Sequence, residues 1–246
     1  NHNINHYPRR TMEFIDWLAQ LDESLLLWLN GIHSPYFDTF MYLFSGKLVW
    51  IPMYAAILYV LLVNFKLRTA LLCLLSIGLV IVIADQVGAS LIRPMVERLR
   101  PSNLDNPISE LVHIVNGVRG GRYGFPSCHA ANTVGLAVIV HLIFRHRGLS
   151  AFMAIWAIVT CYSRIYLGVH YPGDIIVGSI LGALSAWFVY TLLMRLTRNT
   201  RYAIPTPNSC TSATKPIATT HSLRHIYAPV AVGLATILAF AFVPLF

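Results

Sequence analysis

The chain has 246 residues, of which 56% are hydrophobic and only 11% are charged, and its mean hydropathy is +0.61. A typical soluble domain carries about 25% charged residues, so this composition excludes a disordered chain and argues against an ordinary soluble fold. The class that remains is an integral membrane protein of one domain. The net charge of +8 agrees with basic cytoplasmic loops, and without a nucleic-acid-binding motif no nucleic-acid partner is expected.

The N-terminal residues differ from the rest of the chain. Residues 1–11 are polar and do not begin with Met, and we interpret them as a leader or an upstream remnant that precedes a plausible start at Met12. Residues 12–47 form an amphipathic N-terminal segment whose apolar residues recur at helical spacing on both sides of a break at Pro35. This segment is expected to lie in the membrane interface or to cross the membrane once, imperfectly.

Six apolar runs follow, and each is a candidate transmembrane helix. They comprise residues 48–65, 69–92, 130–144, 149–167, 175–196 and 227–246. A helix needs about 20 apolar residues to cross a bilayer, so the short third run is expected to continue the helix of the motif before it. The predicted fold is an all-α, polytopic membrane helix bundle of about six transmembrane helices. It has a catalytic core at 48–197, a polar cytoplasmic linker at 198–226 and a C-terminal transmembrane helix at 227–246.

Basic residues in the short loops predict the orientation. By the positive-inside rule, the side that carries most of them faces the cytoplasm. The segment 93–128 and the turn 164–174 then face the periplasm from a bacterial inner (cytoplasmic) membrane. These segments carry arginines too, and that excess requires a chemical reason. The residues that mark the cytoplasmic side are Lys66, Arg68, Arg145, Arg147, Arg195, Arg198 and Arg201.

Three clusters of polar residues offer a chemical reason for these arginines, and the first lies at the start of the fifth apolar run. His170 and Asp174 are four residues apart, so they share a face if a helix starts near His170. A carboxylate on one imidazole nitrogen fixes the tautomer and leaves the other nitrogen free to attack. Arg164, shortly before them, has a guanidinium suited to anionic oxygens. The alternative is an interfacial histidine beside a solvated aspartate.

A second cluster precedes the third apolar run and reads Pro126-Ser127-Cys128-His129. Ser127 is a good N-cap for the helix that follows, and the free N–H groups of a first helical turn bind anions. His129 lies within that turn and can exchange a proton at neutral pH. The alternative is a plain helix cap with an incidental histidine.

A third cluster lies at the end of the second apolar run. Arg93 and Arg100 are seven residues apart, which is about 10 Å of helical rise. Both reach one phosphate only if the backbone bends, and Pro94 and Pro101 favour a break. Arginines that snorkel at the membrane edge are the alternative. Together, the three clusters supply what phosphoryl transfer without a metal requires, because arginines and backbone N–H groups neutralise the phosphoryl oxygens.

The clusters resemble the type 2 phosphatidic acid phosphatase family, also called the lipid phosphate phosphatases. Its motif is Lys-x6-Arg-Pro, then Pro-Ser-Gly-His, then Ser-Arg-x5-His-x3-Asp, and the resemblance covers about residues 48–196. The sequence departs from the motif at two positions. Arg93 replaces the lysine, which keeps the charge but changes a compact donor into a forked one. Cys128 replaces the glycine, which puts in doubt a close approach of the backbone to phosphate.

The resemblance implies a role for each residue. His170 would be the nucleophile that forms a phosphohistidine, and Asp174 would orient it. His129 would protonate the leaving group and then activate water. The phosphate would be bound by Arg93, Arg100, Ser127, Cys128 and Arg164. The resemblance implies neither a metal nor an organic cofactor.

The predicted function is therefore a metal-independent membrane lipid phosphatase that acts on a phosphomonoester or a diphosphate. Its expected partners are a lipid phosphate substrate and the bilayer, and the oligomeric state is left open. Candidate substrates are undecaprenyl diphosphate, a lipid A phosphate, phosphatidylglycerophosphate and phosphatidate. A lipid phosphotransferase would share the same site. A membrane transporter would explain the spans but not the clustered histidines, arginines and aspartate.

Overall fold

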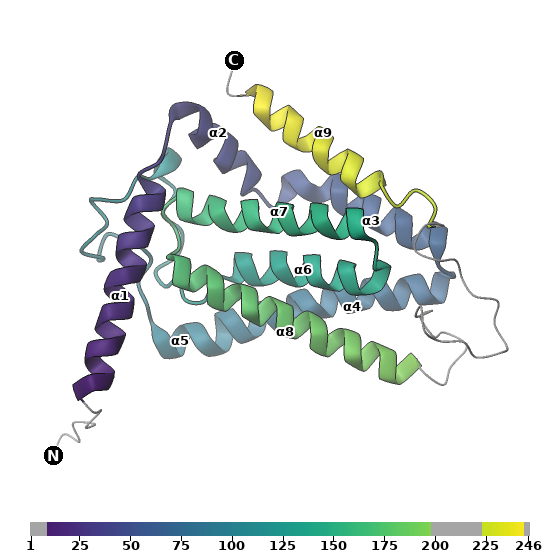
Figure 1. Ribbon diagram of the computed structural model, residues 1–246, viewed down its shortest axis with the longest axis horizontal. Coiled ribbons are helices and arrows are strands. Elements are labelled where there is room, and N and C mark those ends of the chain that lie inside the picture. Colours follow the sequence, from purple (N-terminus) through teal and green to yellow (C-terminus); the bar gives the residue numbers. More distant parts are fainter. Residues whose placement is uncertain (1–8, 198–222, 244–246) are drawn as a thin grey trace.

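The computed structural model describes residues 9–197 and 223–243. Within these ranges the chain forms helices, turns and one long loop, without a strand (Figure 1). This confirms the all-α prediction. The longer helices are α1 (Arg9–Asn30), α2 (Pro35–Phe44), α3 (Ile51–Asn64), α4 (Leu67–Gln86), α6 (Cys128–Phe144), α7 (Arg147–Tyr166), α8 (Pro172–Thr197) and α9 (Ala228–Phe242). The short ones are η1 (Leu48–Trp50), η2 (Val87–Ile92), α5 (Arg93–Val96) and η3 (Val115–Gly117).

Three helices are long and apolar enough to cross a membrane. They are α7, α8 and the 30-residue Leu67–Val96, in which α4 continues through the π-turn η2 into α5. The pair Pro35–Phe44 and Leu48–Asn64 adds a fourth span if its 69° bend is accepted within one crossing. The helices α6 and α9 are apolar but shorter, at 17 and 15 residues. These helices fit a membrane protein, while the count of six spans stays a prediction.

The N-terminal helices lie against the end of the bundle. α1 begins at Arg9, so the predicted boundary at residue 12 falls inside this helix, and residues 1–8 lie outside the described residues. The predicted break at Pro35 is confirmed, because Ser34 caps α2 by accepting a hydrogen bond from the N–H of Phe37. Figure 1 shows α1 crossing the ends of α7 and α8. Of the predicted linker, residues 198–222 also lie outside the described residues.

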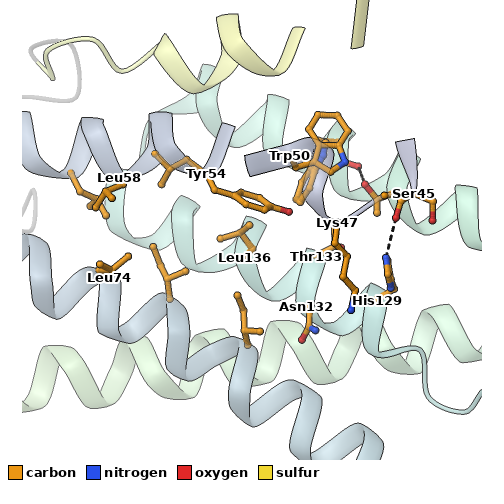
Figure 2. A pocket seen from close by; sticks show the side chains of 17 residues that line it. Ser45, Lys47, Trp50, Tyr54, Leu58, Leu74, His129, Asn132, Thr133 and Leu136 are labelled. Atoms are coloured by element: carbon orange, nitrogen blue, oxygen red, sulfur yellow. Dashed lines mark hydrogen bonds between the residues drawn. The ribbon is translucent and has the colours of Figure 1, made fainter. Parts of the chain in front are cut away.

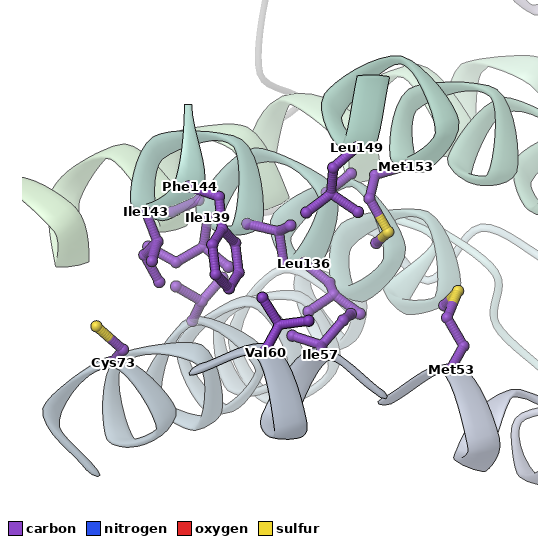
Figure 3. Close-up of a cluster of buried hydrophobic side chains, with 14 of the residues drawn as sticks. Met53, Ile57, Val60, Cys73, Leu136, Ile139, Ile143, Phe144, Leu149 and Met153 are labelled. Carbon is purple, nitrogen blue, oxygen red and sulfur yellow. The ribbon is translucent and has the colours of Figure 1, made fainter. Parts of the chain in front are cut away.

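The core surrounds α6, which packs against α4, α7 and α8. Figure 3 shows buried apolar side chains from α3, α4, α6 and α7 that meet between the helices. Large apolar side chains also cover the outer faces, where Leu75, Ile158 and Trp187 are 62–68% exposed. Such side chains suit lipid rather than water as the surrounding medium.

The closest helix contact joins α6 to α8 at two glycines. A Cβ atom on Gly178 would collide with the carbonyl oxygen of Ser127, and one on Gly182 would collide with the carbonyl oxygen of Ala131. Small residues allow membrane helices to approach this closely. The first turns of α6 and α8 are thereby held side by side.

The chain reverses direction after α5, and this brings the two predicted arginines together. Pro94 lies in the first turn of α5. The break comes at Glu97, between Pro94 and Pro101, where the backbone is left-handed with φ 49°, so the predicted bend between Arg93 and Arg100 is confirmed. The N–H of Arg100 then donates to the carbonyl of Arg122 at 3.0 Å.

The basic turns lie at the other end of the bundle. The turns that join α3 to α4 and α6 to α7 lie opposite the loop of residues 97–127 (Figure 1). Of the basic residues predicted to face the cytoplasm, those at these two turns and Arg195 at the end of α8 therefore lie at the opposite end of the molecule from the arginines of the three clusters. Arg198 and Arg201 lie outside the described residues. Which end faces the cytoplasm stays a prediction.

Candidate active site

The centre of the site is a buried histidine–aspartate pair at the start of α8. His170 lies in the turn between α7 and α8, and its Nδ1 is 3.2 Å from Oδ2 of Asp174 in the first turn of α8. The same Oδ2 accepts the backbone N–H of Tyr171 at 3.1 Å. Both side chains are at most 3% exposed. Asp174 thereby fixes the imidazole with Nδ1 as the donor and Nε2 as the nitrogen that carries the lone pair.

Arg100 faces that second nitrogen. Its Nη1 is 2.7 Å from Nε2 of His170 and also donates to the carbonyl of Val169 at 2.9 Å. Burial, together with the charges of Arg100, Arg164 and Arg93, holds the pKa of His170 well below its usual value of 6.5. Burial and the charge of Arg93 lower the pKa of Arg100 to about 10. At neutral pH, His170 is therefore a neutral imidazole beside cations, as a nucleophile for an anionic group must be.

Arg98 contacts Asp174, and this arginine was not identified as a site residue from the sequence. Nη1 of Arg98 is 3.1 Å from Oδ1 of Asp174 and 2.7 Å from Oδ2 of Asp22 in α1. Asp22 also accepts the backbone N–H of Gly173 at 2.7 Å. The guanidinium of Arg98 lies 3.8 Å from the ring centre of Tyr171. These contacts tie α1 to the turn that presents His170.

The first turn of α6 forms another wall of the site. Ser127 is fully buried and caps α6 by accepting the N–H of Ala130 at 3.3 Å, which confirms the predicted N-cap. Its own N–H donates to the carbonyl of Asp174 at 3.0 Å. Nε2 of His129 lies 3.2 Å from the carbonyl oxygen of Ser45, whose hydroxyl accepts from Arg164 Nη1 at 2.5 Å. Ser45, in the turn after α2, was also not identified from the sequence.

The two departures from the family motif touch one another. Nη2 of Arg93 is 3.0 Å from Sγ of Cys128 and 3.2 Å from the carbonyl oxygen of Pro126. An ideal Cβ built on Gly88 in η2 would lie 3.2 Å from the same sulfur. The forked guanidinium therefore bonds to the thiol that replaces glycine, and the two replacements form one contact.

Three buried donors converge on the site without an acceptor. Within the described residues, Nε of Arg93, Arg100 and Arg164 is buried and has no hydrogen-bond partner. Buried N–H groups are almost always paired in proteins, so three unpaired donors in one cluster suit an anionic ligand. Gly124 keeps the space open, because a Cβ there would lie 3.0 Å from Asp174 Oδ2 and 3.1 Å from Arg100 Cγ.

An apolar cavity of about 430 Å³ opens beside His129. Figure 2 shows Lys47 and Asn132 at the same end of the cavity as His129, and Leu58 and Leu74 at the far end. The walls come from α3, α4, α6 and α7. Lys47 is exposed and, like Ser45, belongs to the turn between α2 and η1. The cavity thus joins a polar end at the candidate site to a hydrophobic end within the bundle.

All the predicted site residues meet in one region of the described structure. The residues that sequence reasoning missed are Asp22, Ser45, Lys47 and Arg98. Arg98 stands among the variable positions of the first motif, and the other three lie in the N-terminal segment, so the motif carries no signal for any of them.

The PAP2 superfamily model matches residues 69–198, more than half of the chain. The chain belongs to the PAP2 superfamily. It is accordingly a phosphoric ester hydrolase of the PAP2 lipid phosphatase family, as the resemblance of its three clusters implies. The helices that present those clusters, from η2 to α8, all fall within the matched stretch.

Relatives within the superfamily are similar over most of this chain. A protein from Bacteroides thetaiotaomicron named lipid A 4'-phosphatase is 51% identical over 193 residues, which is 78% of this chain and 86% of that protein. One of the same name from Porphyromonas gingivalis is 36% identical over 182 residues, which is 73% and 76% of the two chains. A crystal structure of a phosphatidylglycerolphosphate phosphatase from Bacillus subtilis shares the fold at 21% identity, with a TM-score of 0.56 over 74% of this chain and 89% of that one.

Proposed function

We propose that this protein removes the 4'-phosphate of lipid A by way of a phosphohistidine on His170. The observation that carries the chemistry is the neutral Nε2 of His170, backed by Asp174 and surrounded by three arginines whose Nε groups find no acceptor among the described residues. The choice of lipid A rests on the relatives of that name, one of which is 51% identical.

The reaction runs in two displacements. In the first, Nε2 of His170 attacks phosphorus, a P–N bond forms, and the P–O bond to the lipid breaks. The negative charge of the bound phosphate favours a protonated His129, which gives its proton to the leaving oxygen, so the lipid departs as an alcohol. In the second, His129 takes a proton from water, whose oxygen attacks phosphorus. The P–N bond breaks, inorganic phosphate leaves, and His170 is restored.

The arginines supply the charge that this reaction needs. The transferred group carries negative charge on its three equatorial oxygens in the transition state, and fixed cations stabilise it without reorganisation. Arg93, Arg100 and Arg164 offer that charge from three different elements. The proposed mechanism thereby needs no metal ion to neutralise the phosphoryl group.

The apolar cavity suits a phosphate that is attached beside an acyl chain. Its polar end lies at His129 and its lining is largely hydrophobic, so an acyl chain that leaves the bilayer for this cavity stays in apolar surroundings while its neighbouring phosphate enters the site. Lys47 lines the cavity at the same end as His129. In this proposal its ammonium binds polar oxygens of the leaving lipid.

We also propose that the catalytic end faces the periplasm. Lys66 and Arg68 at one turn, and Arg145 and Arg147 at another, lie at the opposite end of the bundle, and basic turns favour the cytoplasm. Leu104, which is 75% exposed in the loop of residues 97–127, offers a labelling position. In a chain without its native cysteines, an impermeant thiol reagent should label Leu104→Cys in intact spheroplasts and Arg147→Cys only after lysis. The reverse pattern would place the site in the cytoplasm.

The function is tested with purified protein and a panel of lipid phosphates. We expect fastest phosphate release from lipid A, with mass spectrometry locating the loss at the 4' position. Faster release from undecaprenyl diphosphate, phosphatidylglycerophosphate or phosphatidate would overturn the choice of substrate and leave the chemistry intact. With labelled p-nitrophenyl phosphate, whose leaving group departs without a proton from His129, His129→Ala should accumulate an acid-labile phosphoenzyme that His170→Ala does not form. Vanadate should inhibit, because it mimics five-coordinate phosphorus.

The cavity is tested with two neighbouring leucines. Leu74 lines the cavity, whereas Leu75 faces outward and is 68% exposed. Leu74→Trp should lower kcat/KM for acylated lipid A while leaving the hydrolysis of p-nitrophenyl phosphate unchanged. Leu75→Trp serves as the matched control. Equal effects of both variants on kcat/KM for lipid A would show that the acyl chain does not bind in the cavity.

A further inference from the structure

Three metal-ligating side chains meet beside the turn that joins α1 to α2. His33 belongs to that turn, Asp38 to the first turn of α2, and His113 to the loop of residues 97–127. Each offers one ligand atom, and these atoms all lie within 4.8 Å of one another. None of the three belongs to the phosphate site or to the lining of the cavity beside His129. The cluster is therefore separate from the proposed catalytic chemistry.

The cluster is close to the geometry of a metal site. Nε2 of His113 is 3.0 Å from Oδ1 of Asp38, and two ligands bound at about 2.1 Å in a tetrahedral zinc site lie about 3.4 Å apart. The rings of His33 and His113 stack at 3.7 Å with 2° between their planes. The lone pairs of stacked rings lie in two parallel planes and cannot meet at one ion, so the ring of His33 must turn to share an ion with His113. His33 is exposed, so this turn is a rotamer change without repacking.

The other two ligands are held in place by their neighbours. The hydroxyl of Tyr166 donates to Oδ1 of Asp38 at 2.7 Å. The side-chain amide of Asn30 accepts the backbone N–H of His113 at 2.7 Å and donates to its carbonyl at 3.0 Å. A hydrogen bond to the ligating side chain, such as that of Tyr166 to Asp38, orients a ligand in metal sites, and Asn30 fixes the backbone that carries His113. The structure thus has two fixed ligands and one that is free to close on an ion.

We infer that His33, Asp38 and His113 bind a divalent transition metal, for which Zn²⁺ is the best match. Two imidazoles and one carboxylate suit zinc, with water as the fourth ligand. The ion would join the α1–α2 turn to the loop that carries Arg98 and Arg100, so its role is structural. This inference goes beyond the proposed function, because no step of phosphate transfer passes through the ion.

The test measures zinc binding and thermal stability of the purified full chain after removal of metal with EDTA. His2, His6, Cys210 and His221 lie outside the described residues and are replaced in every sample so that they contribute no zinc. We expect each chain to bind one Zn²⁺ and its Tm to rise with Zn²⁺. His33→Ala should weaken zinc affinity about 100-fold and lose the rise in Tm. His141→Ala, an exposed histidine at the far end of α6, is the matched control.

Two outcomes overturn the inference. One is an unchanged affinity and Tm response in His33→Ala, and the other is the absence of zinc binding in the parent chain, which would leave a hydrogen-bonded cluster. His33 is exposed, so its replacement keeps the folded core. EDTA should lower Tm without reducing the initial rate of phosphate release. That rate distinguishes the metal site from the proposed function, since a failure of one leaves the other standing.

Discussion

The two walls of the phosphate site are built in different ways. The α6–α8 wall carries Ser127, His129 and Asp174, is held by backbone contacts at two glycines, and lies within the stretch that the PAP2 model matches. The N-terminal wall carries Asp22 from α1, and Ser45 and Lys47 from the turn after α2, outside that stretch. Under the proposed mechanism, the first wall holds groups that perform phosphoryl transfer, and the second holds groups that position them and receive the lipid. The predictions below perturb first one wall and then the other.

The largest effect is expected where the nucleophile itself is removed. His170→Ala should lower kcat by about 10⁴-fold or more, since no covalent route remains. Phosphate release from lipid A measures the loss, and an unchanged Tm establishes that the variant is folded. Retention of even a tenth of the activity would remove His170 from the mechanism.

A smaller effect is expected at Asp22, which acts through Arg98. Asp22 shares that guanidinium with Asp174, so Asp22→Asn leaves Arg98 to draw Asp174 away from its geometry with His170. We expect kcat to fall about tenfold with little change in KM. The control is Asp16→Asn, an exposed aspartate of α1. A rise in KM at constant kcat would instead make Asp22 part of lipid recognition.

Lys47 should affect substrate binding rather than turnover. Lys47→Ala is expected to raise KM for lipid A about fivefold, equivalent to about 1 kcal/mol, and to leave kcat for p-nitrophenyl phosphate unchanged. Lys47→Arg should keep most of the affinity. Lys66→Ala, at the opposite end of the bundle, controls for the loss of one charge. Equal changes in KM for lipid A and for p-nitrophenyl phosphate would show that Lys47 binds the phosphate group rather than the lipid.

The smallest effect concerns the contact between Arg93 and Cys128. Arg93→Lys and Cys128→Gly should each lower kcat/KM about threefold, while the double variant should lose less than the product of the two. Kinetics of the four proteins on lipid A give the coupling. Strictly multiplicative losses would show that the two departures from the motif are independent.

Local sequence patterns predicted the α6–α8 wall well. Spacing alone places His170 near Asp174, and the cap preference of serine places Ser127 at the start of α6, because both relations span only a few residues. The helices also extend beyond several predicted apolar runs. α8 starts at Pro172 rather than at residue 175, since its first turn holds the buried Asp174, which hydrophobicity does not detect.

The same local patterns could not predict the residues of the N-terminal wall. The contact between Asp22 and Gly173 spans 151 residues, and the one between Ser45 and Arg164 spans 119. No periodicity or spacing rule relates residues so far apart, and an amphipathic segment is compatible with many docking positions. The sequence thus predicted the residues that meet at the α6–α8 wall and left out those that contact them from the N-terminal segment.

Gly178 and Gly182 limit which substitutions this enzyme can accept during evolution. Any side chain at either position would push the backbone of α6 away from α8 and separate His129 from Asp174, so mutation on this face is restricted to glycine. The cavity beyond Lys47 has no such restriction, because its walls are side chains that tolerate exchange for others of similar volume. Descendants of this sequence can therefore acquire new lipids through the cavity and the N-terminal turn while the reaction itself is inherited unchanged.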